Sequence, residues 1–385
     1  MIDRRTTLKT GVAGLLALTA AGAGLLPSAG AELPASTEAP DAAGLQKILD
    51  DIAASAASAV LAEVHDSGRV WRGSSGVAEL GSARPVTVNG RFRAGSITKS
   101  FVATVVLQLA GERRIRLDDP VERWLPGVID AGDRITLHQL LQHTSGIVNY
   151  TNTRAFRTLY GTVDEVVGLR DRTWTPQELL DFTAGQPLLF EPGTSWMYSN
   201  TNYILLALVI QRVTGHHYAK EVDRRILRKL RLLGTELPGR RSVITGPHAH
   251  GYLPREQDGS IEPVDITTFN PSVTGASGEL VSTATDLSRF YGALLTGRLL
   301  RPEQQAQLLT SRTTGRSYDY GLGLQTRLVN GIRVWGHEGD IFGYQAASWT
   351  TEDGRRQLTA AWSPWGESDP QPYLENLLAT AFRTT

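Results

Sequence analysis

The sequence predicts an α+β fold in which an antiparallel sheet is built from both ends of the chain, flanked by N- and C-terminal helices, with a mostly helical lobe inserted between. Strand-like segments occur at residues 59–64 and 70–73, and four more follow residue 320. The residues between them mostly have helical apolar spacing and proline boundaries. The 385 residues, 41% of them hydrophobic, are enough for one large domain or two closely packed lobes.

The first segment of the chain has the features of a targeting sequence. Arg4 and Arg5 form a twin-arginine region, residues 11–26 are apolar, and residues 29–31 form a small-residue cleavage site. We therefore predict a twin-arginine-type signal peptide at residues 1–31, a flexible leader at 32–43, and a protein that is secreted or held at the cell envelope. The alternative is a retained membrane anchor, although this apolar run is short for a membrane span, and we expect no stable span after processing.

Residues 44–385 are predicted to form one domain with two lobes. The sheet lobe comprises residues 44–116 and 279–385, and the helical lobe comprises residues 117–278. In order along the chain, the predicted elements are a helix at 45–53, a hairpin of strands 59–64 and 70–73, the helix that begins at Ser96, helices near 137–143, 176–183, 202–213 and 285–295, strands at 321–327, 332–337, 343–350 and 357–362, and a closing helix near 372–382.

Charge and composition argue against several classes of function. Equal numbers of acidic and basic residues, 39 of each, do not suit a surface for nucleic acid or for an anionic membrane. With no cysteine, the chain has no disulfide, thiol nucleophile or cysteine-ligated zinc. The neighbouring histidines at 216–217 and 248–250 lack an acidic partner at a useful spacing, so we predict no metal site and no cofactor.

Ser96 and Lys99 form the only Ser-x-x-Lys in the sequence, in a chain with just five lysines among its 39 basic residues. A glycine-rich turn precedes Ser96 and an apolar helix follows, which places Lys99 one helical turn away on the same face. A buried lysine can lose its proton, whereas an arginine cannot. The helix dipole also favours the neutral amine and an oxyanion above Ser96. The pair predicts an activated nucleophile, although alone it also fits an N-cap serine followed by an exposed lysine.

Three further motifs accompany this pair. A His-Thr-Ser-Gly stretch at 143–146 closes a helix, a Tyr-x-Asn at 198–200 follows Phe-Glu-Pro-Gly, and a His-x-Gly at 337–339 lies on a late strand. A second Tyr-x-Asn at 150–152 lacks that lead and lies too close to residues 143–146. The set resembles the serine β-lactamase/penicillin-binding superfamily, in particular the class C β-lactamases and exported D-alanyl-D-alanine carboxypeptidases with related esterases.

The resemblance implies a role for each matching residue. Ser96 corresponds to the acylated nucleophile, Lys99 to its base partner and Tyr198 to the group that protonates the leaving group. Asn200 corresponds to a contact with the substrate amide and with the lysine, and His337 takes the place of the third-motif Lys or His. The backbone N–H groups of Ser96 and Asp340 correspond to the oxyanion hole, and the predicted substrate-binding residues are Glu338, Gly339 and Phe342.

The implied activity is that of an exported serine hydrolase with a covalent acyl-enzyme. The first expectation is a D-alanyl-D-alanine carboxypeptidase acting on peptidoglycan stem peptides, with β-lactams as slow or suicide substrates. A β-lactamase, an esterase or a D-amino-acid peptidase would use the same residues on another substrate. A penicillin-binding sensor without turnover is the alternative from a different class. The sequence does not indicate an oligomeric state.

One motif departs from the family pattern. Glu338 stands where a Thr or Ser commonly helps to bind a substrate carboxylate, and Gln325 stands near the expected position of a carboxylate-binding Arg. A Glu338 side chain that faces the cleft would repel such a carboxylate, unless Arg327 or Arg333 compensates. Specificity is expected to lie in the helical lobe, with residues 269–272 as further pocket candidates.

Overall fold

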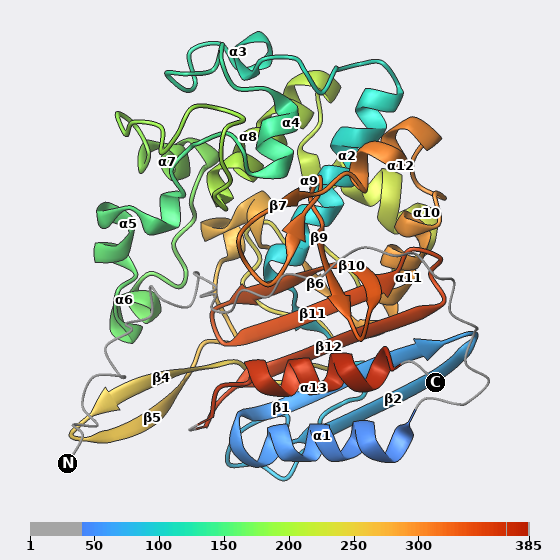
Figure 1. Ribbon diagram of the computed structural model, residues 1–385. Coiled ribbons are helices and arrows are strands. Elements are labelled where there is room, and N and C mark those ends of the chain that lie inside the picture. Colours follow the sequence, from blue (N-terminus) through green and yellow to red (C-terminus); the bar gives the residue numbers. More distant parts are fainter. Residues whose placement is uncertain (1–40, 367, 384–385) are drawn as a thin grey trace, which may run out of the picture.

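The computed structural model describes residues 41–366 and 368–383, and it confirms the predicted fold class. Its main feature is one antiparallel eight-stranded sheet with the order β2-β1-β12-β11-β10-β9-β8-β7 (Figure 1). The two ends of the chain meet where β1 pairs with β12, in a register that sets Val60 opposite Trp362. The strands are β1 (Ala57–Asp66), β2 (Arg69–Gly76), β7 (Arg312–Thr313), β8 (Asp319–Tyr320), β9 (Gln325–Val329), β10 (Ile332–Ile341), β11 (Tyr344–Thr351) and β12 (Arg356–Pro364).

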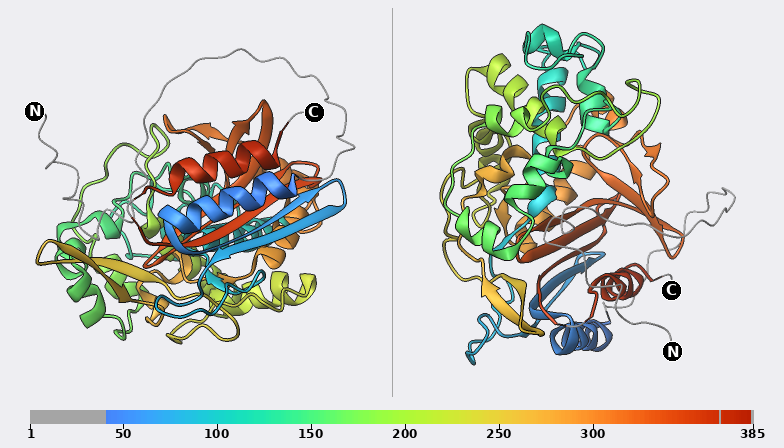
Figure 2. Two further views of the ribbon diagram at one scale, coloured as in Figure 1. Left: turned by 90° about the horizontal axis from the view of Figure 1, so that it is seen from below. Right: turned by 90° about the vertical axis from the view of Figure 1, so that its left-hand side faces the viewer.

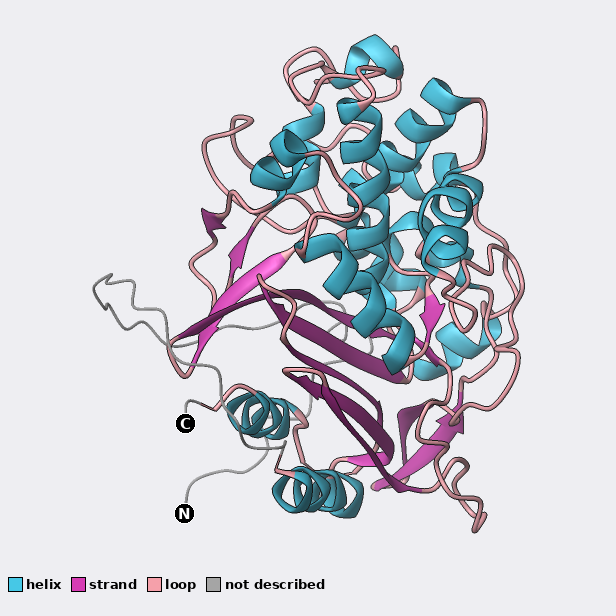
Figure 3. Cartoon of the chain, turned by 90° about the vertical axis from the view of Figure 1, so that its right-hand side faces the viewer, coloured by secondary structure: helices cyan, strands magenta, loops and turns pink. Residues whose placement is uncertain are grey.

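Helices cover both faces of the sheet. The terminal helices α1 (Ala42–Ser55) and α13 (Gln371–Ala381) lie side by side on one face, and α2 (Thr98–Gly111) and α11 (Ala284–Leu295) cover the other (Figures 2 and 3). The Asp41 side chain caps α1 by accepting from the Gly44 N–H at 2.9 Å. This helix therefore includes the last two residues of the predicted leader, whereas residues 1–31 and most of that leader lie outside the described part of the chain.

The hydrophobic residues form one core on each face of the sheet. Under the terminal helices, Leu45 and Leu49 of α1 pack with Trp349 of β11 and Leu377 of α13. On the other face α2 is buried on nearly all sides, which explains the uniformly apolar sequence after Ser96. The first turn of α2 contacts α11, where the Phe101 ring stacks on Phe290 with ring centres 3.7 Å apart.

The inserted lobe is mostly helical, as predicted. Threonine capping boxes begin α4, α6 and α7, each with a Gln or Glu three residues later. Its helices are α3 (Val121–Trp124), α4 (Leu137–Gln142), α5 (Arg154–Leu159), α6 (Val163–Gly168), α7 (Pro176–Asp181), α8 (Asn200–Thr214), α9 (Tyr218–Val222) and α10 (Arg228–Leu230), and α12 (Pro302–Leu308) follows α11. None of the helices in residues 41–366 and 368–383 has the length and apolar character needed to cross a membrane.

Six short strands were not predicted from the sequence, among them β7 and β8 at the edge of the main sheet. A hairpin of β4 (Tyr252–Gln257) and β5 (Ser260–Asp265) projects from the inserted lobe (Figure 1). The two-residue strands β3 (Phe92–Arg93) and β6 (Val281–Ser282) pair with each other. This pairing joins the segment just before Ser96 to the segment where the chain returns from the inserted lobe to the sheet lobe.

Candidate active site

Ser96 lies in a 3-10 turn, Gly95–Ile97, that leads into α2. Gly95 has a φ of +50°, and a Cβ there would lie 2.7 Å from the Asp340 nitrogen. A Cβ on Gly339 would lie 1.9 Å from the Ala94 carbonyl oxygen. Because both positions lack a side chain, the end of β10 packs backbone to backbone against this turn. The backbone N–H groups of Ser96 and Asp340 are thereby brought together, as an oxyanion hole requires.

Lys99 is fully buried directly beneath Ser96. Its Nζ lies 3.0 Å from Ser96 Oγ and donates a hydrogen bond to the Ser277 carbonyl at 2.6 Å. Burial holds the pKa of Lys99 well below its usual value, because the charged form loses its hydration. Burial therefore favours the neutral amine, which is the form that accepts a proton from the serine hydroxyl.

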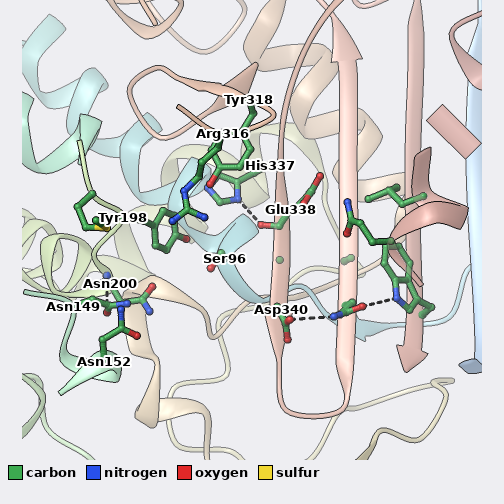
Figure 4. A pocket seen from close by; sticks show the side chains of 17 residues that line it. Ser96, Asn149, Asn152, Tyr198, Asn200, Arg316, Tyr318, His337, Glu338 and Asp340 are labelled. Carbon is green, nitrogen blue, oxygen red and sulfur yellow. Dashed lines mark hydrogen bonds between the residues drawn. The ribbon is translucent and has the colours of Figure 1, made fainter. Parts of the chain in front are cut away.

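Tyr198 lies beside the same two groups, just before α8. Lys99 Nζ is 4.8 Å from the centre of its ring, and its hydroxyl is directed toward Ser96 (Figure 4). Burial raises the pKa of Tyr198 well above its usual value, so the hydroxyl keeps its proton. The structure thus brings Ser96, Lys99 and Tyr198 together, and Figure 4 shows Ser96 and Tyr198 at the cleft. Tyr150 of the second Tyr-x-Asn instead donates its hydroxyl to the Val273 carbonyl at 2.8 Å.

Asn200 is the first residue of α8 and borders the cleft. Its backbone N–H donates to Asn149 Oδ1 at 3.1 Å, and its amide nitrogen lies 3.5 Å from Thr151 Oγ1 (Figure 4). Asn149 and Asn152 also line the cleft. These three amides form a polar wall beside Tyr198. Only Asn200 among them was predicted from the sequence to belong to the site.

His337 is buried and uses both ring nitrogens within the protein. Nδ1 lies 2.5 Å from the Glu338 carbonyl oxygen, which can only accept, so Nδ1 carries the hydrogen. Nε2 therefore accepts from the Tyr320 hydroxyl, 3.0 Å away. Burial, with a smaller contribution from Lys99, lowers the pKa of His337 to about 3, so the ring is neutral. Tyr320 was not predicted from the sequence, because β8 does not pair with β10: β9 lies between them in the sheet.

Glu338 and Asp340 add two carboxyl groups to the cleft. Burial raises the pKa of each to about 7. Asp340 accepts from Gln345 Nε2 at 3.1 Å, and Gln345 in turn accepts from the Trp362 indole at 2.7 Å (Figure 4). Because side chains alternate along a strand, both carboxyl groups point to the face of β10 opposite to Gly339, which packs against the Ser96 turn. They therefore form an acidic wall at the rim of the cleft, on the side of Trp362.

Of the two arginines expected to offset Glu338, only Arg327 lies close enough to favour its charged form, and the nearby Glu375 opposes that effect. Arg327 forms a bidentate ion pair with Glu375 of α13 at 2.8 and 2.5 Å, and Arg333 is exposed and does not line the cleft. Gln325 is fully buried and accepts from the Glu338 N–H at 2.9 Å. The guanidinium that does line the cleft belongs to Arg316, on the β7–β8 connection, which the sequence analysis did not identify.

The cleft has a volume of about 870 Å³ including its open mouth, which suits an amino-acid derivative or a short peptide. Phe342 was wrongly predicted to bind substrate. It is buried in an aromatic cluster, 5.9 Å from the Tyr160 ring and 5.4 Å from that of Phe269. Residues 269–272 do not line the cleft either. Its lining residues are Ser96, Asn149, Asn152, Met197, Tyr198, Asn200, Arg316, Tyr318, His337, Glu338, Gly339, Asp340, Gln345, Ala346, Trp362, Gln371 and Leu374.

The neighbouring histidines at 216–217 and 248–250 have partners within the protein. His250 contacts Asp265 at 2.6 Å, and His216 contacts Glu221 at 3.1 Å. In the described part of the chain, no group of three or more His, Asp or Glu side chains is arranged to hold a metal ion.

Comparisons with known proteins agree with this geometry. The model of a family described as Beta-lactamase matches residues 45–369. Among solved structures, a D-stereospecific amidohydrolase from Streptomyces sp. is 37% identical, with a TM-score of 0.82 over 90% of this chain and 100% of that one. A D-amino acid amidase from Ochrobactrum anthropi SV3, crystallised with L-phenylalanine amide, is 26% identical, with a TM-score of 0.75 over 88% and 97% of the two chains.

A further similar protein is a penicillin-binding protein. Penicillin-binding protein 4* of Bacillus subtilis (strain 168) is 28% identical over 307 residues, which are 75% of this chain and 64% of the relative. The chain therefore spans less than two thirds of that relative's length.

Proposed function

We propose, since this chain belongs to the Beta-lactamase family, that it is a serine hydrolase that cleaves amides of D-amino acids through an acyl-enzyme on Ser96. The observation that carries this proposal is the buried Lys99 amine, 3.0 Å from Ser96 Oγ at the base of an open cleft. The D-amino-acid substrate class is supported by the similarity to a D-stereospecific amidohydrolase along that protein's whole length.

The reaction follows from the positions of the groups. Lys99 accepts the hydroxyl proton as Ser96 Oγ bonds to the substrate carbonyl carbon. The carbonyl oxygen becomes an oxyanion between the N–H groups of Ser96 and Asp340. Tyr198 gives a proton to the amide nitrogen as the C–N bond breaks, and recovers one from Lys99. Water then hydrolyses the ester, which releases the D-amino acid and restores the serine.

The acidic wall of the cleft favours substrates without a terminal carboxylate. A leaving group that carries a carboxylate would approach Glu338 and Asp340, and close like charges repel by ~1–4 kcal/mol. An amide or ester that leaves as ammonia, an amine or an alcohol avoids this repulsion. This is our reason for placing a D-amino-acid amide before a D-alanyl-D-alanine peptide.

Replacing Glu338 by threonine tests that preference. We expect Glu338→Thr to raise kcat/KM for a peptide with a free C-terminal carboxylate, relative to its methyl ester, by about tenfold, because one negative charge is removed from the cleft. The relative gain should be larger at pH 8 than at pH 6, since the pKa of Glu338 is about 7. Glu338→Gln, which also removes the charge, is the matched control. An acid-to-ester ratio unchanged in both variants would contradict the assigned repulsion.

A D-alanyl-D-alanine carboxypeptidase is the second candidate. Arg316 lines the same cleft and supplies a guanidinium to which a peptide carboxylate can bind. The similarity to penicillin-binding protein 4* also favours it.

Product analysis with mass spectrometry distinguishes the candidates. The protein is incubated separately with D-phenylalanine amide, L-phenylalanine amide, a D-Ala-D-Ala peptide and a fluorescent penicillin. Release of D-phenylalanine but not L-phenylalanine, with an adduct on Ser96 that is absent from Ser96→Ala, is the expected result. Release of D-alanine alone would favour the carboxypeptidase. A stable penicillin adduct without any turnover would indicate a sensor, and no adduct or product from any substrate would overturn the proposal.

A further inference from the structure

The segment that carries Tyr198 is held on both sides by one residue, His143, to which the proposed reaction assigns no step. The Met197 N–H donates to the His143 carbonyl at 3.0 Å, and the Ser199 N–H donates to His143 Nδ1 at 3.2 Å. Between these two hydrogen bonds the Tyr198 ring lies over the imidazole, with ring centres 4.3 Å apart. The residue before Tyr198, the residue after it and the phenol itself thus all contact His143.

The backbone of His143 makes this arrangement possible. His143 ends α4 in the left-handed region, with a φ of 62°, and its side chain is completely buried. Few residues other than glycine adopt this conformation, but it directs both the carbonyl and the ring toward residues 197–199. The capping box at Thr136 fixes the other end of α4, so the support beneath Tyr198 is anchored at both ends.

A chain of hydrogen bonds determines the tautomer of His143. The Ile147 N–H donates to Ser145 Oγ at 3.1 Å, and the Ser145 hydroxyl donates to Asn202 Oδ1 at 2.8 Å. The Asn202 amide therefore presents its nitrogen to His143 Nδ1, at 3.2 Å. Since the Ser199 N–H also donates to Nδ1, this atom must keep its lone pair and Nε2 must carry the hydrogen.

A second proton on the ring is strongly disfavoured. It would place an N–H at Nδ1 against two other N–H donors. Burial holds the pKa of His143 well below its usual value, and a proton on Lys99 or His337 would lower it further. The imidazole is consequently a neutral hydrogen-bond acceptor and packing surface that does not exchange protons during turnover.

We propose that His143 is a positioning residue for Tyr198: its carbonyl, its Nδ1 lone pair and its ring together hold the phenol hydroxyl against Ser96. This inference rests on the proposed function, because Tyr198 must be the group that protonates the leaving nitrogen. His143 would thus act in catalysis through Tyr198, in addition to its structural role of joining two loops.

Two substitutions separate the acceptor from the ring. His143→Phe keeps an aromatic surface but removes the acceptor of the Ser199 N–H. His143→Asn removes the ring but places an oxygen near the position of Nδ1, and asparagine tolerates the left-handed backbone. Turnover is measured on D-phenylalanine p-nitroanilide, and kcat is divided by the fraction of Ser96 that a fluorophosphonate labels, counted by intact mass. A purely structural defect lowers the labelled fraction but leaves kcat per labelled site unchanged.

We expect His143→Phe to lower kcat per labelled site by about 100-fold, as small misplacements of catalytic groups do, and His143→Asn to lower it by less than about tenfold. In a Tyr198→Phe background, the His143→Phe effect should shrink to less than about threefold, because the hydroxyl it positions is gone. Equal losses in both backgrounds, or an unchanged kcat per site, would overturn the inference. If His143→Phe does not fold, His143→Asn is tested in its place. A loss of kcat per labelled site that is as large in the Tyr198→Phe background as in the wild-type background would then overturn the inference. If Tyr198→Phe alone costs no activity, the proposed mechanism fails first.

Discussion

Replacing Lys99 by arginine is expected to slow acylation of Ser96 by about 10³-fold, within the range of general-base contributions. The Lys99 amine lies 3.0 Å from Ser96 Oγ in a fully buried position, and burial lowers its pKa. Arginine keeps a positive charge at this position but cannot accept a proton. The measurement is the pre-steady-state rate of adduct formation with a D-phenylalanine ester, followed by rapid-quench mass spectrometry.

A Lys99→Met variant is the matched control, because methionine has a similar length and needs no hydrogen bond when buried. It should fold, as judged by circular dichroism and thermal melting, and should lose acylation to the same extent. In the wild-type protein, acylation should rise with pH as Lys99 loses its proton, with a midpoint well below the usual lysine pKa of 10.5. That dependence should disappear in Lys99→Met. Acylation by Lys99→Arg at a rate near that of the wild type would rule out the role of proton acceptor.

Much of the fold could be predicted because its signals are local. The hairpin β1–β2 and the strands β9 to β12 show recognisable strand segments, and α1, α11 and α13 show helical spacing close to their observed bounds. The strands β3 and β6 have two residues each, too few to form a periodic pattern, and they form only where two segments distant in the sequence pair with each other. Pairing between distant short segments is a tertiary effect that sequence patterns do not carry.

The same distinction applies to the site. The Ser-x-x-Lys spacing places Ser96 and Lys99 on one helix turn, so their proximity follows from helix geometry alone. Arg316 lines the cleft from a loop between two-residue strands, and no motif marks it. Phe342 was predicted to bind substrate because it lies only two residues beyond Asp340 along the chain. The turn after β10 instead directs its ring into the core.

Replacing Tyr198 by phenylalanine is expected to reduce hydrolysis of D-phenylalanine amide by about 10²- to 10³-fold, but that of the p-nitrophenyl ester by less than about tenfold. The reason is the leaving group. The nitrogen of an amide must gain a proton before it departs, whereas p-nitrophenolate leaves as a stable anion. In this structure the tyrosine hydroxyl is directed toward Ser96, and burial keeps it protonated, so it is placed to supply that proton.

The ratio of amide to ester turnover is therefore the decisive quantity, since any general loss of folded enzyme cancels from it. Tyr150→Phe is the control: Tyr150 is also buried, but its hydroxyl binds the Val273 carbonyl at 2.8 Å, so its loss should leave the ratio unchanged even where stability falls. Equal losses on both substrates for Tyr198→Phe would mean that the hydroxyl acts before the leaving group departs, for example by orienting Ser96. A selective loss on the amide would place Tyr198 at the cleavage of the C–N bond, the step that separates an amidohydrolase from an enzyme restricted to activated esters.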